Sequence, residues 1–474
     1  MQEGPVAEAR RLRDGGRFDE AVKVLDAHLR EHPDDAEAER LRAQTLYWLK
    51  ELAGADAAYA AALQRHPDHE GLRLDYARML AETGRLHEAA ALLDAPRDGR
   101  RSAEASALLG TIHYWRGDLA GAKRLFEAAL RRDPAHQEAA RQLREIRAVS
   151  APWLRIEPRL WHDDQPLDTA GVTVEAGWFF TPLTSIAVRS RPVRYSTESA
   201  QTFWLNEVEF SSVAPLARLE TRLGAGAFRG RGGGYEWTGQ ATVGIRAGGG
   251  VTLRGRLDRS PYTSTLASVD EPIMTVIAAA SLHVDRRGWL GEATIRRDAY
   301  PDENAVRSAY AWLLAPIAVG TQGRLQAGYA IAAADADEDR FVLARPQQPY
   351  PPTDPRFDFS GVYRPYFTPA RQLTHSALAA VTAGRSGGPV FKVGGSYGFR
   401  AGEDASAFQA SGAQVISVIE RRDYTPWTAR ASLEIPASPL VSFSFGGEAG
   451  RTAYYRWATA QLALTFRFIP ATDR

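Results

Sequence analysis

The spacing of apolar residues changes once along the chain, near residue 150, and this change constrains the fold most. Up to about Val149 the sequence is rich in Ala, Leu, Arg and Glu, and its apolar residues recur with helical spacing. Beyond Pro152 it is rich in Gly, Thr, Ser, Val and aromatic residues, and apolar and polar residues alternate. One kind of element cannot have both periods. The sequence therefore predicts an α + β chain of two domains, over 1–150 and 151–474.

The first domain repeats itself every 33 or 34 residues. Small and large apolar residues recur in one register: Ala21, Ala55, Ala89 and Ala122, then Leu25, Tyr59, Leu93 and Phe126. Turn residues follow the same register: Gly16, Gly84 and Gly117, and Pro33, Pro67 and Pro134. A single helix pair cannot bury its apolar face, so stacked copies share one core. The pattern resembles the tetratricopeptide repeat and predicts an α-solenoid of four repeats with a capping helix over 135–149. Such a solenoid offers a binding surface rather than chemistry, and a spacer that binds nothing is the alternative.

The second domain consists of runs of about 10 to 14 residues that alternate apolar and polar side chains. About sixteen such runs fit between Trp153 and Phe468. Runs this long exceed the mean soluble strand of about 5–6 residues. Aromatic residues gather near the ends of runs, as at Trp178, Trp204, Trp289, Trp312 and Trp457, which is typical of outer-membrane barrels. A sheet in lipid must close on itself. We therefore expect a transmembrane barrel of about sixteen antiparallel strands; a soluble sandwich or propeller is the alternative.

A barrel of this kind implies an outer membrane, with the repeats in the periplasm. The first residues carry no basic segment followed by an apolar one, so we expect that a signal peptide has been removed. The absence of cysteine suits an oxidising compartment and excludes thiolate metal sites and cysteine nucleophiles. Lys and Arg total 58 against 57 for Asp and Glu, which gives no net field for gathering nucleic acid.

No catalytic constellation stands out. His162, His283 and His375 are isolated in sequence, and the WHDD run over 161–164 indicates a turn more than a metal site. The glycines of 230–234 lack the strand-to-helix context of a phosphate loop. The sequence predicts neither an enzyme nor a cofactor or metal.

If the apolar faces of the strands contact lipid, the polar faces line the interior. The candidate pore-lining residues are Arg189, Arg191, Glu207, Glu209, Arg218, Glu220, Arg222, Glu236, Arg254, Arg256, Asp258, Glu292, Arg296, Lys392, Arg400, Arg430 and Glu434. Candidates for stacking on sugar rings are Trp153, Trp161 and Tyr366. Acids and bases are interspersed, so many are expected to pair across strands in a structural role. Together they predict a polar, water-filled channel, and their balance argues against a strongly charged cargo.

The longest connection runs from Ala334 to about Arg371. Loops of this length without secondary structure are uncommon and usually functional. Three placements are open: a constriction inside the lumen, a cap over the outer mouth, or an inert surface loop.

Periplasmic tetratricopeptide repeats joined to a barrel of about sixteen strands resemble the outer-membrane exporters of exopolysaccharide systems, above all the cellulose synthase operon exporter. DRSPYTSTLASV at Asp258–Val269 is similar to that family's arginine-proline-threonine-serine-leucine-serine segment. YRPYFTPARQ at Tyr363–Gln372 is similar to its tyrosine-phenylalanine-serine-proline-glutamine segment. Those exporters carry a longer array of repeats than the four visible here.

The resemblance implies a passive pore for a cellulose-like or related polymer that an inner-membrane synthase elongates. Its partners would be the polysaccharide chain, periplasmic or inner-membrane synthase components that dock on the repeats, and outer-membrane lipid, with no nucleic acid. The alternative is a barrel that does not transport and whose repeats assemble a periplasmic complex as a scaffold or receptor.

Overall fold

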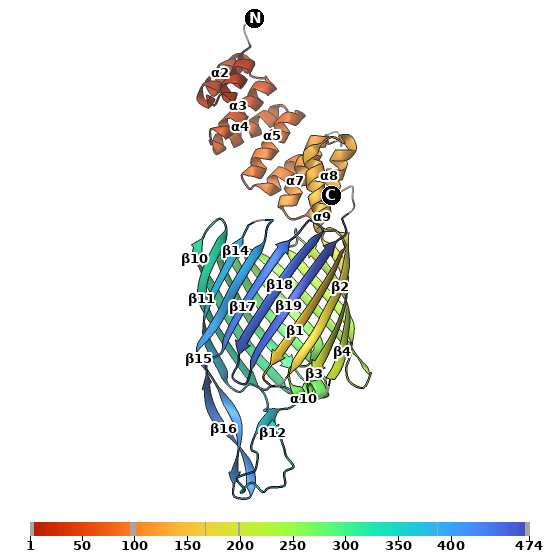
Figure 1. Ribbon diagram of the computed structural model, residues 1–474. Helices are drawn as coiled ribbons and strands as arrows, with labels where there is room; N and C mark the ends of the chain where they lie inside the picture. The colour runs from red at the N-terminus through yellow and green to blue at the C-terminus, as the bar shows by residue number, and fades with distance from the viewer. Residues whose placement is uncertain (1–3, 95–100, 166, 198–199, 386, 470–474) are drawn as a thin grey trace. The chain divides into compact units, whose positions relative to one another are not determined.

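The computed structural model describes residues 4–94, 101–165, 167–197, 200–385 and 387–469 (Figure 1). These residues form two compact units, Met1–Val149 and Ser150–Arg474. None of the helices in the described ranges is long and apolar enough to cross a membrane.

The first unit contains nine described helices, arranged as four antiparallel pairs and a last single helix. They are α1 (Pro5–Asp14), α2 (Phe18–Glu31), α3 (Ala36–Trp48), α4 (Leu52–Arg65), α5 (Glu70–Glu82), α6 (Leu86–Asp94), α7 (Ala103–Trp115), α8 (Leu119–Arg132) and α9 (Gln137–Val149). The prediction of a tetratricopeptide-repeat α-solenoid is confirmed.

The repeated residues form the core of this unit. The small residues of the register are fully buried: Ala21, Ala55, Ala89 and Ala122. The large ones are at most 3% exposed: Leu25, Tyr59, Leu93 and Phe126. Small residues allow close approach between helices: a Cβ on Gly110 of α7 would lie 2.7 Å from the Phe126 ring of α8. The turn glycines Gly16, Gly84 and Gly117 have positive φ, the conformation that glycine adopts without steric cost.

The second unit is a closed antiparallel barrel of sixteen strands. Its strands are β1 (Trp153–Asp163), β2 (Asp168–Thr181), β3 (Thr184–Ser196), β4 (Ala200–Ala214), β5 (Leu219–Arg229), β6 (Tyr235–Gly248), β7 (Val251–Tyr262), β8 (Ile273–Arg286), β9 (Trp289–Ala299), β10 (Ala305–Val319), β11 (Gly323–Ala336), β14 (Gln372–Gly384), β15 (Val390–Ser411), β17 (Trp427–Pro436), β18 (Val441–Arg451) and β19 (Arg456–Arg467). Strand β1 pairs with both β2 and β19, which closes the ring.

The two ends of the barrel differ in their connections. The end that holds Trp153 and Arg467, the barrel termini, has turns of two to five residues. The opposite end, called the loop end below, carries the long connections. One of these contains α10 (Leu266–Asp270), and another contains the short strands β12 (Phe341–Leu343) and β13 (Gly361–Tyr363). The outer half of β15 pairs with β16 (Gln414–Tyr424) and extends beyond the other strands (Figure 1).

The outer face of the barrel is apolar, and no second sheet covers it in the described chain. Val243, Leu257 and Ile295 project outward from β6, β7 and β9 and are 43%, 54% and 66% exposed. These exposed side chains are what a lipid-facing surface requires, and the alternative of a soluble sandwich or propeller is wrong. Trp178, Trp204 and Trp289 also face outward.

Two of the aromatic residues expected at the lipid interface do not lie there. Trp312 of β10 is the register partner of the inward-facing Glu292 of β9. Trp457 of β19 is the register partner of the inward-facing Asp163 of β1. Both lie on the luminal side of their strands, and Trp312 stands in the middle of β10 rather than near its end. Position along a strand does not fix which face a residue occupies.

Candidate functional site in the barrel lumen

Strand register places most of the predicted pore-lining residues on the inner face of the barrel. They are Arg189, Arg191, Glu207, Glu209, Glu220, Arg222, Glu236, Arg254, Arg256, Asp258, Glu292, Arg296, Lys392, Arg430 and Glu434. Directly paired residues of neighbouring strands share a face, so the assignment can be followed from strand to strand around the ring.

Arg400 is a correction to the predicted lining. The register between β14 and β15 shifts by one residue between His375 and Ser376, which leaves Phe399 as the extra residue. Such a bulge interrupts the alternation of faces. Arg400 therefore pairs with His375, whose ring bonds to Tyr329 on the outer face. Its side chain lies outside the lumen.

Arg218 is also a correction, and Glu236 lies at the edge of the lining. Arg218 lies in the turn before β5, at φ 54°, and its N–H donates to the Pro215 carbonyl. Glu236 lies at the loop end of β6, and its carboxylate is 3.0 Å from Arg259. The Arg259 guanidinium covers the Trp237 ring on the outer face, 4.2 Å from its centroid. Arg218 therefore belongs to the rim of the barrel, whereas register pairs Glu236 with Phe228 and places it on the inner face, near the loop end.

A network of charges fastens β2, β3 and β4 on the inside. Arg189 lies 2.7 Å from Glu175, 3.6 Å from Glu207 and 4.0 Å from Glu209. Gln240 donates to the same Glu209 carboxylate at 2.6 Å. All four charged side chains are four-fifths or more buried, so they act as wall structure.

Other luminal charges are paired as well. Arg256 binds Asp258 at 3.0 Å and Lys392 binds Glu434 at 2.7 Å. Arg296 holds both oxygens of Asp298, at 2.6 and 2.8 Å. This pairing lowers the number of charges that remain free to hold a passing polymer.

A smaller set of luminal arginines makes no ion pair with any described residue. It includes Arg159, Arg191, Arg222, Arg254, Arg324 and Arg430. Arg324 and Arg430 line a luminal cavity of about 400 Å³ together with Arg159, Trp312 and Glu448. Sequence reasoning missed Arg159, Arg324 and Glu448. The alternation along β1, β11 and β18 identifies them once the strand bounds are known.

The two predicted tryptophans lie on the inner face of β1. Trp153 donates its indole N–H to Glu175 at 2.9 Å and packs against Phe179. Trp161 stacks on Trp457, with ring centroids 4.9 Å apart and planes within 7°. Their role in stacking on sugars stays a prediction.

Tyr366 does not offer its ring to a sugar, which is a further correction. The residue is fully buried, and its ring stacks on Tyr300 at 3.4 Å. Its hydroxyl donates to Asp302, whose two carboxylate oxygens both lie 2.7 Å away. Burial and this carboxylate raise the pKa of Tyr366 to about 12, so it stays a neutral donor. The long loop uses Tyr366 as an anchor.

The returning arm of the long loop, residues 363–368, crosses the mouth of the barrel at the loop end. The Pro365 carbonyl accepts a hydrogen bond from Thr265 Oγ1 at 2.6 Å, in the β7–β8 connection. Phe367 packs against Tyr454, in the β18–β19 connection, at 5.1 Å between centroids. Eight strands separate these two connections in either direction around the ring, so they lie opposite each other. The arm therefore bridges the mouth.

The short helix α10 fills another part of the same mouth. Its Val269 is fully buried in a cluster with Leu167, Phe203 of β4 and Phe228 of β5. Phe203 and Phe228 lie on the inner faces of β4 and β5, the same face of β4 that carries Glu207 of the charge network. Both the arm and α10 thus narrow the lumen at the loop end.

The described ranges contain no group of three or more His, Asp or Glu side chains that could hold a metal ion. The fold and the site together define a transmembrane β-barrel with a polar lumen, joined to a tetratricopeptide-repeat solenoid.

Residues 49–112 match the tetratricopeptide repeat family. No curated protein matches the sequence. Among solved structures, the chain is similar to a bacterial polysaccharide outer membrane secretin, at 9% identity and a TM-score of 0.48, over 67% of this chain and 99% of that chain. It is also similar to PilF of Pseudomonas aeruginosa, at 23% identity and a TM-score of 0.28, over 30% of this chain and 65% of that chain. PilW, a type IV pilus biogenesis factor, gives 20% identity and a TM-score of 0.28 over 30% and 67%.

Proposed function

We propose that this chain is an outer-membrane pore that exports an exopolysaccharide, cellulose-like or related, made by an inner-membrane synthase. The observation that carries the proposal is a closed barrel with a polar interior and a mouth bridged by its own long loop. A barrel that only anchored a scaffold would need neither a polar lumen nor a loop across its opening.

The chemistry of the lumen suits a hydrated, hydroxyl-rich chain. Guanidinium groups without ion pairs, such as Arg324 and Arg430, donate several hydrogen bonds and accept none. The paired charges, such as Arg189 with Glu175, satisfy each other within the wall. Conduction requires binding weak enough for release. A wall that holds most of its charges in internal pairs meets that condition.

The tetratricopeptide repeats are proposed to lie in the periplasm and to dock synthase components or guide the chain. Short turns face the periplasm in outer-membrane barrels, and the barrel termini lie at the end with short turns. Repeat arrays create extended concave surfaces for partners. The barrel needs no driven step, because elongation at the synthase pushes the polymer outward.

Single-channel conductance in planar bilayers tests this function. The full chain is compared with a variant in which a short Gly-Ser turn replaces residues 338–369, which leaves β11 and β14 intact. We expect small or infrequent openings in the full chain and a stable, larger conductance in the variant. Neutral oligosaccharides should block the open form more than charged ones of equal length.

Both the full chain and the loop variant must first be shown to be folded, by their heat-dependent mobility on SDS gels. A folded and inserted variant without conductance would contradict the pore and leave the scaffold or receptor as the better account. Block by anionic oligosaccharides alone would contradict a neutral, cellulose-like polymer while keeping the pore.

A further inference from the structure

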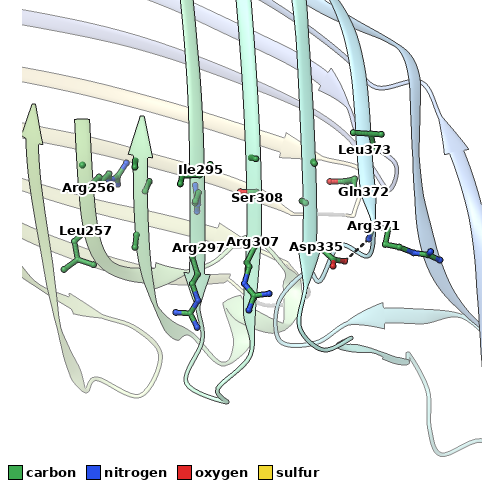
Figure 2. Close-up of a pocket in the computed structure, with 18 of the residues that line it drawn as sticks. Arg256, Leu257, Ile295, Arg297, Arg307, Ser308, Asp335, Arg371, Gln372 and Leu373 are labelled. Atoms are coloured by element: carbon green, nitrogen blue, oxygen red, sulfur yellow. Dashed lines mark hydrogen bonds between the residues drawn. The ribbon is translucent and has the colours of Figure 1, made fainter. Parts of the chain in front are cut away.

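The outer wall of the barrel has a hollow that transport of a polymer does not explain. It measures about 1160 Å³, lies on the outer faces of β6 to β11 and β14, and has an apolar lining. Figure 2 shows it with the loop that joins β9 and β10 at its lower end. Register places its outward side chains on the lipid-facing side, opposite the luminal Arg256 and Arg296.

The floor of the hollow is made of small residues. They are Gly255 of β7, Ala278 and Ala280 of β8, Ala309 of β10 and Ala333 of β11. Leu257, Ile295 and Leu373 stand beside them. A Cβ placed on Gly255 would meet nothing within 4 Å. Small side chains next to larger ones leave a groove of a kind that an acyl chain can fill.

Arg297 and Arg307 lie together at the loop end of this groove, where Arg371 is bound to Asp404. Arg297 of β9 and Arg307 of β10 are direct register partners on the outer face (Figure 2). Like charges directly opposite each other on neighbouring strands destabilise the pair, and cations on the lipid face are costly toward the bilayer centre. Each lies two residues from its strand end, the level at which we expect the headgroups of a bilayer.

The charges around this pair are only partly balanced. Arg307 binds Asp337 at 2.8 Å, whereas Arg297 makes no ion pair with any residue that the structure describes. Asp335, the other register partner of Arg307, accepts the backbone N–H of Arg371 at 2.9 Å. A phosphate lying across Arg297 and Arg307 would relieve their repulsion through charge-assisted hydrogen bonds.

We propose that this groove binds a phosphorylated, acylated glycolipid of the outer leaflet, lipid A, with an acyl chain over the small residues and a phosphate on Arg297 and Arg307. The choice of an outer-leaflet lipid follows from the loop end, because the long loops of such barrels face outward. The inference concerns the wall and holds whichever polymer the lumen carries.

Native mass spectrometry of the full chain, folded in detergent and titrated with purified lipid A, tests the proposal. We expect a one-to-one adduct in the unchanged protein. The double variant R297A/R307A should bind at least tenfold more weakly. Gly255→Phe keeps every charge and fills the groove, so it should also bind at least tenfold more weakly.

Two matched variants serve as controls. Arg194→Ala removes an arginine on the outer face of β3, two residues from the same end of the barrel. Ala176→Phe adds a ring to the outer face of β2. Both should bind lipid A like the unchanged protein. Equal binding by all variants would overturn the proposal. Equally tight binding of phosphatidylglycerol with the same dependence on Arg297 would overturn the choice of lipid A.

Discussion

Lys50 stands at the position that glycine occupies in the other three repeats. Its φ is 66°, against 76°, 84° and 78° for Gly16, Gly84 and Gly117. A side chain in this left-handed conformation crowds the following carbonyl. Lys50→Gly should therefore raise the free energy of unfolding of the helical unit by about 0.5–1 kcal/mol.

The urea midpoint of the helical circular dichroism signal checks this prediction, in detergent that keeps the barrel folded. Gly84→Ala is the matched control and should lower the midpoint, because alanine has the same cost there. A Lys50→Gly midpoint below that of the unchanged protein would show that the Lys50 side chain contributes more than its conformation costs.

Tyr366 anchors the arm of the long loop that crosses the mouth. Its ring lies on Tyr300 at 3.4 Å, and its hydroxyl holds Asp302, which also binds Arg340 at 2.8 Å. Tyr366→Ala should increase the fraction of time that the channel conducts severalfold. Tyr350→Ala removes a ring from another part of the same loop, over which Arg356 is packed. That control should leave channel openings unchanged; an equal effect of both variants would show that the loop acts as a whole.

At the scale of single elements, the start of α8 rests on one carboxylate. Asp118 accepts the Gly121 N–H at 2.9 Å and lies 2.8 Å from His113 Nδ1. A Cβ on Gly121 would lie 2.3 Å from that carboxylate, so glycine is needed beside the cap. Asp118→Ala should lower the free energy of unfolding of the helical unit by about 1–2 kcal/mol at neutral pH.

The same cap has a predictable dependence on pH. Burial favours the protonated form, but the Gly121 N–H and the His113 ring outweigh it and lower the pKa of Asp118 below its usual 3.8. A lowered pKa in the folded state means that the unfolded state binds more protons below pH 4. The stabilisation is therefore complete above the usual value and is lost as the pH falls through the lowered one. Urea midpoints between pH 3 and 7 should show the Asp118→Ala deficit shrinking only at the acid end; a constant deficit would contradict the assignment.

Local sequence patterns predicted the helices and strands. The residues that were misassigned depend on a strand irregularity or on contacts between distant parts of the chain. The 34-residue register identified Ala55 and Tyr59 as core, because a repeat core is built from short-range periodicity. Arg400 was misplaced because one bulge in β15 changes the face of every residue after it. Tyr366 was misassigned because its partner Tyr300 lies 66 positions earlier in the chain, and sequence spacing carries no record of that contact.

At the scale of the whole molecule, the polar lumen and the apolar wall arise from one alternation. In β9, Arg296 pairs with Asp298 inside while Ile295 and Arg297 face outward. A closed ring gives every backbone amide of the wall a partner, which lipid requires. The same ring encloses the lumen. Closure of the sheet therefore both allows the barrel to lie in a membrane and creates its polar interior.

The two units have separate cores, and they should unfold separately. The buried clusters of the helical unit, around Tyr59, Phe126 and Leu25, include none of the described barrel residues. The barrel has no sheet edge at which unfolding can begin, whereas each helix pair contacts only its neighbours. Two units that share no core do not unfold as one two-state system.

We therefore expect two transitions in urea for the full chain in detergent. The helical circular dichroism signal should be lost first, with a midpoint that moves in Lys50→Gly and Asp118→Ala. The heat-dependent shift of the barrel on SDS gels should persist at urea concentrations beyond that transition. A single transition seen by both probes, shifted together by Asp118→Ala, would mean that the repeats and the barrel stabilise each other and act as one cooperative unit.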